Sequence, residues 1–392
     1  MGYGEAVTQR TLTPSVVGSN PATPASLDLK WDPAPSQWDS KLNIPCYRDS
    51  KILAAVGAGP CHSIIQKKGG RPIYISYSRE STYLHCPYQH WLRYVRRLEK
   101  KKPERPLYFG TDFHKLLELR NDPAALKQAK QSISDTYYEL PASYQGDLGE
   151  NYVQDLFSIF DDYTIVYKGI RQPQVTEQEF EIEVGGCKGE PIVFVGKIDE
   201  LYLLKRQGIK SIVVGEHKTF SSKPNMDFLV MNPQKCLYAK AAYFLRGILP
   251  DRVKWDYIRS VPAKEPIWLE KTKRFSEASS TQITPMSWRR ACKARNISDP
   301  EILDKGKRYE SNISEFFFQV ELDIDPAMVE TIWEGYMYTA RQIIRFGESN
   351  KTKNVTRDCS WCPYRDICYS EMTGGDTEYI IARDFEDKSE KR

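Results

Sequence analysis

Two neighbouring predicted strands, each carrying an acidic residue, constrain the fold of this 392-residue chain more than any other feature. Residues 193–203 and 212–218 are rich in β-branched, aromatic and aliphatic side chains, and a short polar segment ending in glycine joins them. This pattern predicts an antiparallel hairpin. Asp199 lies on the first strand. Because side chains alternate along a strand, Glu216 and Lys218 share one face of the second.

The charged residues of this hairpin have a chemistry in common. Carboxylate oxygens such as those of Asp199 and Glu216 are the ligands that Mg²⁺ and Mn²⁺ prefer. Such an ion polarises a phosphoryl oxygen and lowers the pKa of a bound water. Lys218 could position that water or stabilise charge on the phosphate. An isolated Glu-x-Lys is more often a surface cross-strand pair, so the motif needs support from its surroundings.

A capped helix follows the hairpin. Asn232 and Pro233 form an N-cap followed by proline at the first helical position, and residues 234–245 continue as a helix. Gln234 and Tyr238 are one turn apart and project from the same face, at the end of a helix that favours anions. Taken alone, the tyrosine could equally be core and the glutamine solvated.

A second amphipathic helix is predicted upstream, over residues 109–119. His114 sits beside its apolar stripe. A lone histidine in that position is usually a buried core residue rather than a metal ligand, but the chain has only five histidines.

Together these segments resemble the PD-(D/E)XK nuclease superfamily, and specifically its RecB-like branch. The matching residues, in the family's order, are Gly110 and His114; Gly196, Ile198 and Asp199; Glu216 and Lys218; and Gln234 and Tyr238. The resemblance implies an α/β fold: a restriction-endonuclease-like core with a central mixed sheet flanked by helices.

The resemblance also implies roles for these residues. Asp199, Glu216 and Lys218 would be catalytic, and Gln234 and Tyr238 would hold the nucleic-acid strand. The ligands of Mg²⁺ or Mn²⁺ would be His114, Asp199 and Glu216, with the backbone of His217 as a further candidate. The family's additional acidic residue precedes the hairpin, where Glu177, Glu179 and Glu181 are candidates. Of these we favour Glu179.

The cysteines give an independent signal. The chain has nine, and an odd number argues against a disulfide framework and for a reducing compartment, so we expect a cytoplasmic protein. Cys359, Cys362 and Cys368 form a C-x2-C-x5-C spacing, and Cys86 shares the Cys-Pro-Tyr context of Cys362. Four such thiolates could hold either a [4Fe–4S] cluster or zinc.

One early cysteine and a late C-x2-C-x5-C bracket the nuclease motifs. This arrangement resembles the iron–sulfur subset of RecB-like exonucleases, found among AddB-type repair subunits, CRISPR-associated adaptation nucleases and phage relatives. The resemblance favours the cluster over zinc. It also implies a structural role, in which the four-cysteine metal centre joins the N- and C-terminal ends of the domain. The cysteines without a partner spacing are interpreted as ordinary thiols: Cys46, Cys61, Cys187, Cys236 and Cys292.

The remaining sequence predicts one elaborated domain. Residues 1–70 lack periodicity and are expected to be a disordered or non-native extension, 71–372 a single nuclease domain with the iron–sulfur staple, and 373–392 a polar tail. Residues 121–170 and 326–346 are predicted helical. No apolar run approaches the length of a membrane span, and no helicase motif is present, so a helicase or recombination partner would act in trans.

These observations predict a metal-dependent DNA nuclease that hydrolyses phosphodiester bonds, as an exonuclease on single-stranded ends. The net charge of +4 neither demands nor excludes nucleic acid. One alternative is a non-catalytic nucleic-acid-binding iron–sulfur module, and another is a zinc-stapled endonuclease. The trio Asp199, Glu216 and Lys218 favours a nuclease, because a protein that only binds nucleic acid would not need it.

Overall fold

A computed structural model describes most of the chain beyond residue 70. The described residues are 71–102, 104–170, 172–206, 209–277 and 280–388. The predictions for residues 1–70 therefore lie outside the described residues. None of the described helices combines the length and the apolarity that crossing a membrane requires.

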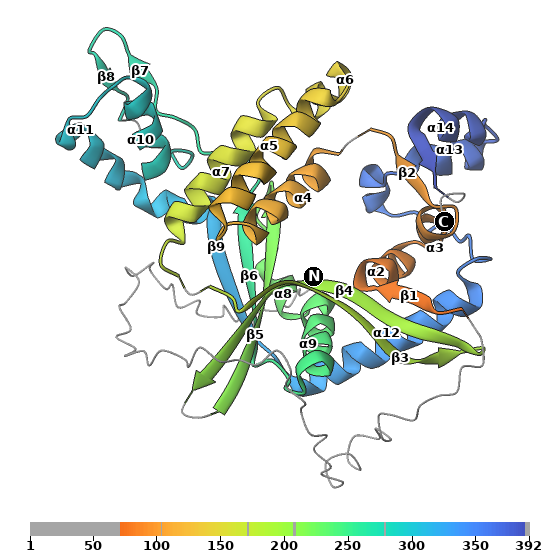
Figure 1. Cartoon of the computed structure of the whole chain (residues 1–392). Coiled ribbons are helices and arrows are strands. Elements are labelled where there is room, and N and C mark those ends of the chain that lie inside the picture. Colours follow the sequence, from red (N-terminus) through yellow and green to blue (C-terminus); the bar gives the residue numbers. More distant parts are fainter. Residues whose placement is uncertain (1–70, 103, 171, 207–208, 278–279, 389–392) are drawn as a thin grey trace, which may run out of the picture. The chain divides into compact units, whose positions relative to one another are not determined.

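A six-stranded mixed sheet forms the centre of the fold (Figure 1). The strand order is β1-β4-β5-β6-β9, with β3 paired to β4; β1 runs parallel to β4 and β5 parallel to β6, and the other pairs are antiparallel. The strands are β1 (Ile73–Ser76), β3 (Val175–Cys187), β4 (Glu190–Arg206), β5 (Ile209–Phe220), β6 (Arg252–Arg259) and β9 (Phe317–Asp323). The predicted hairpin and the α/β fold with a central mixed sheet are both confirmed.

The strands β4 and β5 separate in the middle of the sheet. β5 pairs with β4 from Glu200 onward, whereas β1 pairs with the earlier part of β4, at Ile192–Val195. Beyond Gly215, β5 continues beside β6 alone. Asp199 and Glu216, which the same register would place opposite each other, therefore lie where the two strands diverge.

One face of the sheet packs against α2 (Tyr77–His85), α9 (Pro233–Arg246) and α12 (Pro326–Phe346). Asn232 caps α9 as predicted: its side chain accepts a hydrogen bond from the backbone N–H of Gln234. The core on this face includes Phe194, Ile198, Val214, Leu237, Ala241 and Tyr336. The helix predicted over 326–346 is confirmed as α12.

The opposite face packs against a separate group of helices. These are α4 (Arg105–Glu118), α5 (Pro123–Glu139), α6 (Ala142–Leu148) and α7 (Tyr152–Val166). Their core includes Phe109, Phe113, Leu156, Phe160, Ile258 and Phe317. The prediction that residues 121–170 are mostly helical is confirmed.

Between β6 and β9 the chain forms a small lobe that projects from the sheet (Figure 1). The lobe has its own apolar cluster around Trp288. Its elements are β7 (Trp268–Leu269), β8 (Arg274–Phe275), α10 (Pro285–Ala294) and α11 (Pro300–Asp304). The short helix α8 (Met226–Val230) precedes α9 on the side of the sheet that carries Glu216.

A second lobe joins early and late parts of the chain. It contains α3 (Pro87–His90), β2 (Leu98–Lys100), α13 (Arg365–Thr373), α14 (Thr377–Asp384) and β10 (Phe385–Asp387). β10 pairs antiparallel with β2, and Tyr88, Leu92, Tyr364 and Phe385 pack together. Residues 377–387, which the sequence analysis placed in a polar tail, thus form a helix and a strand because buried Ile381 and Phe385 anchor them.

Candidate active site

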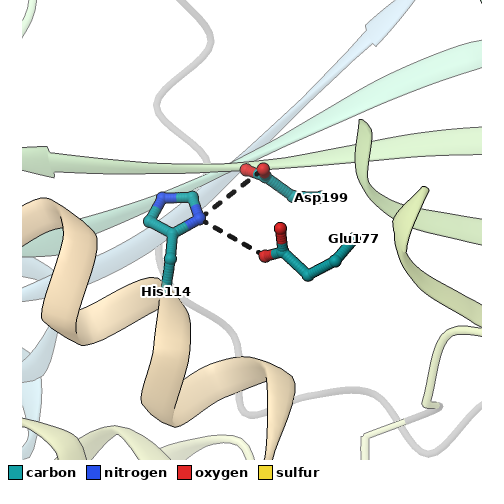
Figure 2. Close-up of side chains that lie close together, drawn as sticks. All are labelled: His114, Glu177 and Asp199. Carbon is teal, nitrogen blue, oxygen red and sulfur yellow. Dashed lines mark ion pairs between the residues drawn. The ribbon is translucent and has the colours of Figure 1, made fainter. Parts of the chain in front are cut away.

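His114, Glu177 and Asp199 come together from α4, β3 and β4 (Figure 2). The His114 Nδ1 atom lies 3.5 Å from Asp199 Oδ1 and 3.7 Å from Glu177 Oε1. One ligand atom from each residue lies within 4.8 Å of the other two, and no other such group of three occurs in the described part of the chain. Two carboxylates and an imidazole suit a divalent ion.

Glu177 is the acidic residue that the structure brings to this group, instead of the favoured Glu179. In the β3–β4 register, Glu179 pairs with Lys197, so the position facing Asp199 belongs to Glu177. The backbone of Glu177 has φ of +52°, a left-handed conformation that costs about 1–3 kcal/mol and is frequent at functional sites. Glu177 also forms an ion pair with Lys197. The register that places Glu177 opposite Asp199 depends on an irregularity of β3 between Glu183 and Gly185, which the sequence pattern does not indicate.

The Asp199 carboxylate is held by the neighbouring strand. Its Oδ2 atom accepts a hydrogen bond of 2.8 Å from the backbone N–H of His217. This contact bridges β4 and β5 where they separate, and it leaves Oδ1 facing His114.

Glu216 is a buried carboxyl group with incomplete bonding. Its side chain is 3% exposed, and Oε2 accepts hydrogen bonds from Lys218 Nζ and Gln234 Nε2, each at 3.2 Å. Oε1 is buried and has no hydrogen-bond partner among the described residues. Burial and the nearby Asp199 charge raise the pKa of Glu216 to about 8, although Lys218 opposes the shift. A cation at Oε1 would supply the missing contact.

Burial lowers the pKa of His114, although the Asp199 charge opposes this shift. This shift favours the neutral imidazole, which is the form that binds a metal ion. The imidazole and the two clustered carboxylates suit a divalent ion. Glu216, which the sequence analysis also predicted as a ligand, lies outside this group of three and offers a buried oxygen without a hydrogen-bond partner among the described residues.

His217 faces the opposite side of the sheet from Glu216. Its Nε2 lies 3.1 Å from Glu200 and its Nδ1 3.4 Å from Asp256, and all three side chains are buried. Burial disfavours the imidazolium, but the two carboxylates outweigh it and raise the pKa of His217 to about 9. Arg120 pairs with Glu200 at 2.8 Å, and the Tyr163 hydroxyl donates to Asp256 at 2.5 Å. The sequence analysis did not identify this layer.

Gln234 and Tyr238 lie on α9 beside Glu216. Gln234 donates to Glu216 Oε2, and Tyr238 packs edge-on against Phe180 with ring centroids 6.3 Å apart. Burial and the nearby Glu216 charge raise the pKa of Tyr238. Contact of either residue with nucleic acid stays a prediction.

Two clefts meet at Lys218 and Thr219, which line both. The polar cleft, of about 580 Å³, also includes His114, Lys115, Glu177 and Lys197. The aromatic cleft, of about 590 Å³, also includes Phe220, Phe228, Trp255 and Tyr257. The Lys218 side chain is 30% exposed, with its Nζ 5.7 Å from the centre of the Trp255 ring. It therefore stands between the two clefts.

The four cysteines of the predicted metal centre lie near one another in the second lobe, although more than 270 residues separate the first from the others. Burial raises the pKa of the Cys362 thiol, and the charges of Cys86, Cys359 and Cys368 raise it further. Cys86 Sγ contacts the Thr352 carbonyl oxygen at 3.9 Å. All seven described cysteines are free thiols. Metal binding by the four stays a prediction.

Comparison with known proteins places the chain in a family. The model of the PD-(D/E)XK nuclease superfamily matches residues 74–369, so the chain belongs to this superfamily. The chain is also similar to the solved structure of SSO0001, with 13% identity over 78% of this chain and 89% of that chain and a TM-score of 0.29. A structure from Eubacterium rectale, provisionally named an exonuclease, shows 9% identity over 77% and 94%, with a TM-score of 0.39. No curated protein matches the chain.

Proposed function

We propose that this member of the PD-(D/E)XK nuclease superfamily is a RecB-like, metal-dependent DNA exonuclease that acts on single-stranded ends with Mg²⁺ or Mn²⁺. One observation carries the proposal. Asp199, Glu216 and Lys218 converge where β4 and β5 separate, with His114 and Glu177 against Asp199. Nucleases of this superfamily generally use such divalent ions.

The residues around Asp199 would hold the ion. His114, Glu177 and Asp199 offer one nitrogen and two carboxylates, and Glu216 adds its unpartnered Oε1. When bound, a divalent ion polarises a phosphoryl oxygen and makes hydroxide available near neutral pH.

The other residues would orient these groups and the substrate. The backbone N–H of His217 fixes one oxygen of Asp199, while Gln234 and Lys218 fix one oxygen of Glu216. The partly exposed Lys218 ammonium can turn toward a phosphate in either cleft and stabilise the charge that develops on its oxygens.

Cleavage of end-labelled single strands tests the proposal. Wild type should degrade linear strands with Mg²⁺ or Mn²⁺ and spare circular single strands, and EDTA should stop the reaction. Asp199→Asn should abolish cleavage, and the control Asp323→Asn, on an exposed carboxylate of β9, should leave it unchanged.

The other results of this experiment are equally decisive. Unimpaired cleavage by Asp199→Asn would overturn the assignment of the site. Binding without cleavage by wild type, with either ion, would identify a non-catalytic module, and cleavage of circles would identify an endonuclease.

We further propose that Cys86, Cys359, Cys362 and Cys368 hold a [4Fe–4S] cluster that staples the two ends of the domain. The four thiols lie near one another in the second lobe, although Cys86 is remote from the other three in the chain. Four thiolates can hold either zinc or a cluster in which each binds a different iron, and the resemblance to iron–sulfur RecB-like exonucleases favours the cluster.

Protein purified without oxygen tests the cluster directly. We expect a brown protein with about four irons per chain and thiolate-to-iron absorption. Cys86→Ala should lose the iron as completely as Cys362→Ala, whereas Cys292→Ala, a buried thiol of the lobe around Trp288, should retain it. A colourless protein with one zinc would replace the cluster by a zinc staple.

The wider setting is also a proposal. Residues 71–372 would form one nuclease domain, which the family match over 74–369 supports. The free thiols suit the reducing cytoplasm. A helicase or recombination protein acting in trans would supply the unwound strand.

A further inference from the structure

The aromatic cleft beside Lys218 has the composition of a ligand site. Its volume of about 590 Å³ lies within the range of roughly 300–1,000 Å³ that is typical of small-molecule pockets. Four aromatic side chains line it: Phe220, Phe228, Trp255 and Tyr257. Amide and hydroxyl groups share the lining: Asn225, Asn232, Gln234 and Thr219. Apolar walls with a few polar groups are what a flat, heteroatom-rich ring requires.

The pairing of β5 with β6 makes this cleft continuous with the proposed active site. Trp255 lies beside Glu216, and Tyr257 beside Lys218, in register. The aromatic residues therefore occupy the same face of the sheet as the proposed catalytic pair. Phe318 of β9 supports this floor by stacking on Tyr257, with ring centroids 4.9 Å apart.

Trp255 carries a bonding group that no described residue satisfies. Its side chain is 3% exposed, and its indole N–H is buried without a hydrogen-bond partner among the described residues. Burying such a donor is costly unless an acceptor reaches it. A ligand atom entering the cleft could be that acceptor.

The wall formed by α8 is apolar and exposed. Phe228 lines the cleft and is 58% exposed, and its neighbours Met226, Val230 and Met231 are exposed as well. Unpaired bases stack on aromatic side chains of this kind. A partly exposed phenylalanine beside a nuclease site is thus suited to contact a base.

The polar cleft supplies the matching path for phosphates. It shares Lys218 and Thr219 with the aromatic cleft, and Lys115 and Lys197 lie along it. A strand whose backbone follows the polar cleft would present its next base to the aromatic cleft on the other side of Lys218.

We propose that the aromatic cleft binds the unpaired base of the nucleotide that adjoins the scissile phosphate. The base stacks against Phe228, and the Trp255 indole N–H and the cleft amides bond to its edge. A base that is still paired cannot enter, so the cleft makes the site selective for single strands. This inference rests on the proposed nuclease function and names what that site recognises.

Strand binding measured by fluorescence anisotropy tests the cleft, with Ca²⁺ as the ion and a label at one end. Two abasic strands are compared with intact strands: one carries the abasic nucleotide at its 5′ end and the label at its 3′ end, and the other has the two exchanged. We expect wild type to bind the intact strand on the order of tenfold more tightly than the abasic strand of one polarity. Phe228→Ala should bind both alike. Met226→Ala, on the same helix but outside the cleft, should keep the difference.

A second variant covers the buried part of the cleft. Trp255→Phe keeps a ring and removes the N–H, so it should reduce the preference for the intact strand by a smaller factor, with folding checked by a thermal melt. A wild type that ignores the abasic nucleotide, or a Phe228→Ala variant that retains the full preference, would overturn the inference.

The two proposals fail in different ways. If the protein binds strands in a base-dependent way but does not cleave them in the presence of Mg²⁺ or Mn²⁺, the nuclease proposal is refuted and the cleft remains a base-binding site. Cleavage that is equally fast on intact and abasic ends would support the nuclease and refute the cleft.

Discussion

Consecutive residues of β5 meet two different environments. Glu216 and Lys218 lie on the face with the aromatic cleft, where one oxygen of Glu216 has no hydrogen-bond partner among the described residues and the lysine is partly exposed. His217 points into the layer beneath α4 and α7, where Glu200 and Asp256 contact both of its nitrogens. The first, which we call the open face, leaves a carboxylate oxygen available to a ligand. The second, the closed face, directs its charged groups toward one another, although His217 Nδ1 and Asp256 Oδ1 also lack a hydrogen bond among the described residues.

The same difference decides the charge of two buried glutamates. Burial favours the neutral acid at both Glu216 and Glu200. At Glu200 three cations, His217, Lys254 and Arg120, outweigh burial and hold its pKa well below the usual range. Among the described residues Glu216 has Lys218 as its one ion-pair partner, and burial together with the like charge of Asp199 raises its pKa to about 8. The nearby charges separate the two: three paired cations at Glu200, against one paired cation and one anion at Glu216.

The largest expected effect comes from removing the centre of the closed face. His217→Ala would leave buried Glu200 and Asp256 short of a positive partner, and breaking a buried ion pair costs about 3–5 kcal/mol. Urea denaturation should show this loss in the free energy of unfolding. His85→Ala, an exposed histidine of α2, is the control and should be neutral. Wild-type stability in His217→Ala would show that the closed layer is not a structural unit.

The open face should respond in the opposite way. Lys218→Ala removes a group that would stabilise the phosphate in the transition state, and losing one such group costs about 10²–10³ in rate. Its side chain is partly exposed, so the urea midpoint should stay near wild type. Lys127→Ala, an exposed lysine of α5, should change neither rate nor stability. Wild-type cleavage by Lys218→Ala would refute the contrast between the faces.

Much of the open face could be predicted from the sequence, because its signals are local. The hairpin, the Asn232 cap and the Glu216-x-Lys218 spacing each depend on a few neighbouring residues. Local pattern also gave the helices at 121–170 and 326–346. Glu177 could not be chosen by pattern, because Glu179 and Glu181 share its strand face and only the register to Asp199 separates them.

The residues of the closed face and of the aromatic cleft could not be predicted from local sequence patterns. Arg120, Glu200, His217 and Asp256 come from three separate elements and from the turn after α4, and none has a diagnostic spacing. Trp255 becomes part of the site only because β6 runs parallel to β5. Residues 377–387 were predicted to belong to a polar tail because their few apolar side chains, Ile381 and Phe385 among them, lie in a largely polar segment.

A third carboxyl group sharpens the role of nearby cations. Glu80 of α2 is buried near Thr339 and has no ion-pair partner among the described residues, and burial raises its pKa to about 7. Its folded pKa lies above the unfolded value of 4.5, so it reduces stability as pH rises from about 4.5 to 7. Glu80→Gln should therefore melt above wild type at pH 8, and the gap should close by pH 4.5.

The exposed Glu139→Gln serves as the control for this melting series and should show the same offset from wild type at every pH. A Glu80→Gln variant less stable than wild type at pH 8 would mean that the ionised carboxylate has a stabilising partner.

The smallest expected effect tests how the open face is held in place. The Tyr238 side chain lies beside Gln234, which donates to Glu216 Oε2, and the Tyr238 ring packs on Phe180. Tyr238→Phe keeps the packing and removes the hydroxyl beside Gln234, where one hydrogen bond is worth about 1 kcal/mol. If that bond serves to position Glu216, cleavage should fall about fivefold with little change in the thermal midpoint. Because the effect passes through Gln234, Tyr238→Phe should add nothing in a Gln234→Ala background. Additive losses in the double variant would instead indicate that the tyrosine contacts the strand directly, and an unchanged rate in the single variant would confine Tyr238 to core packing.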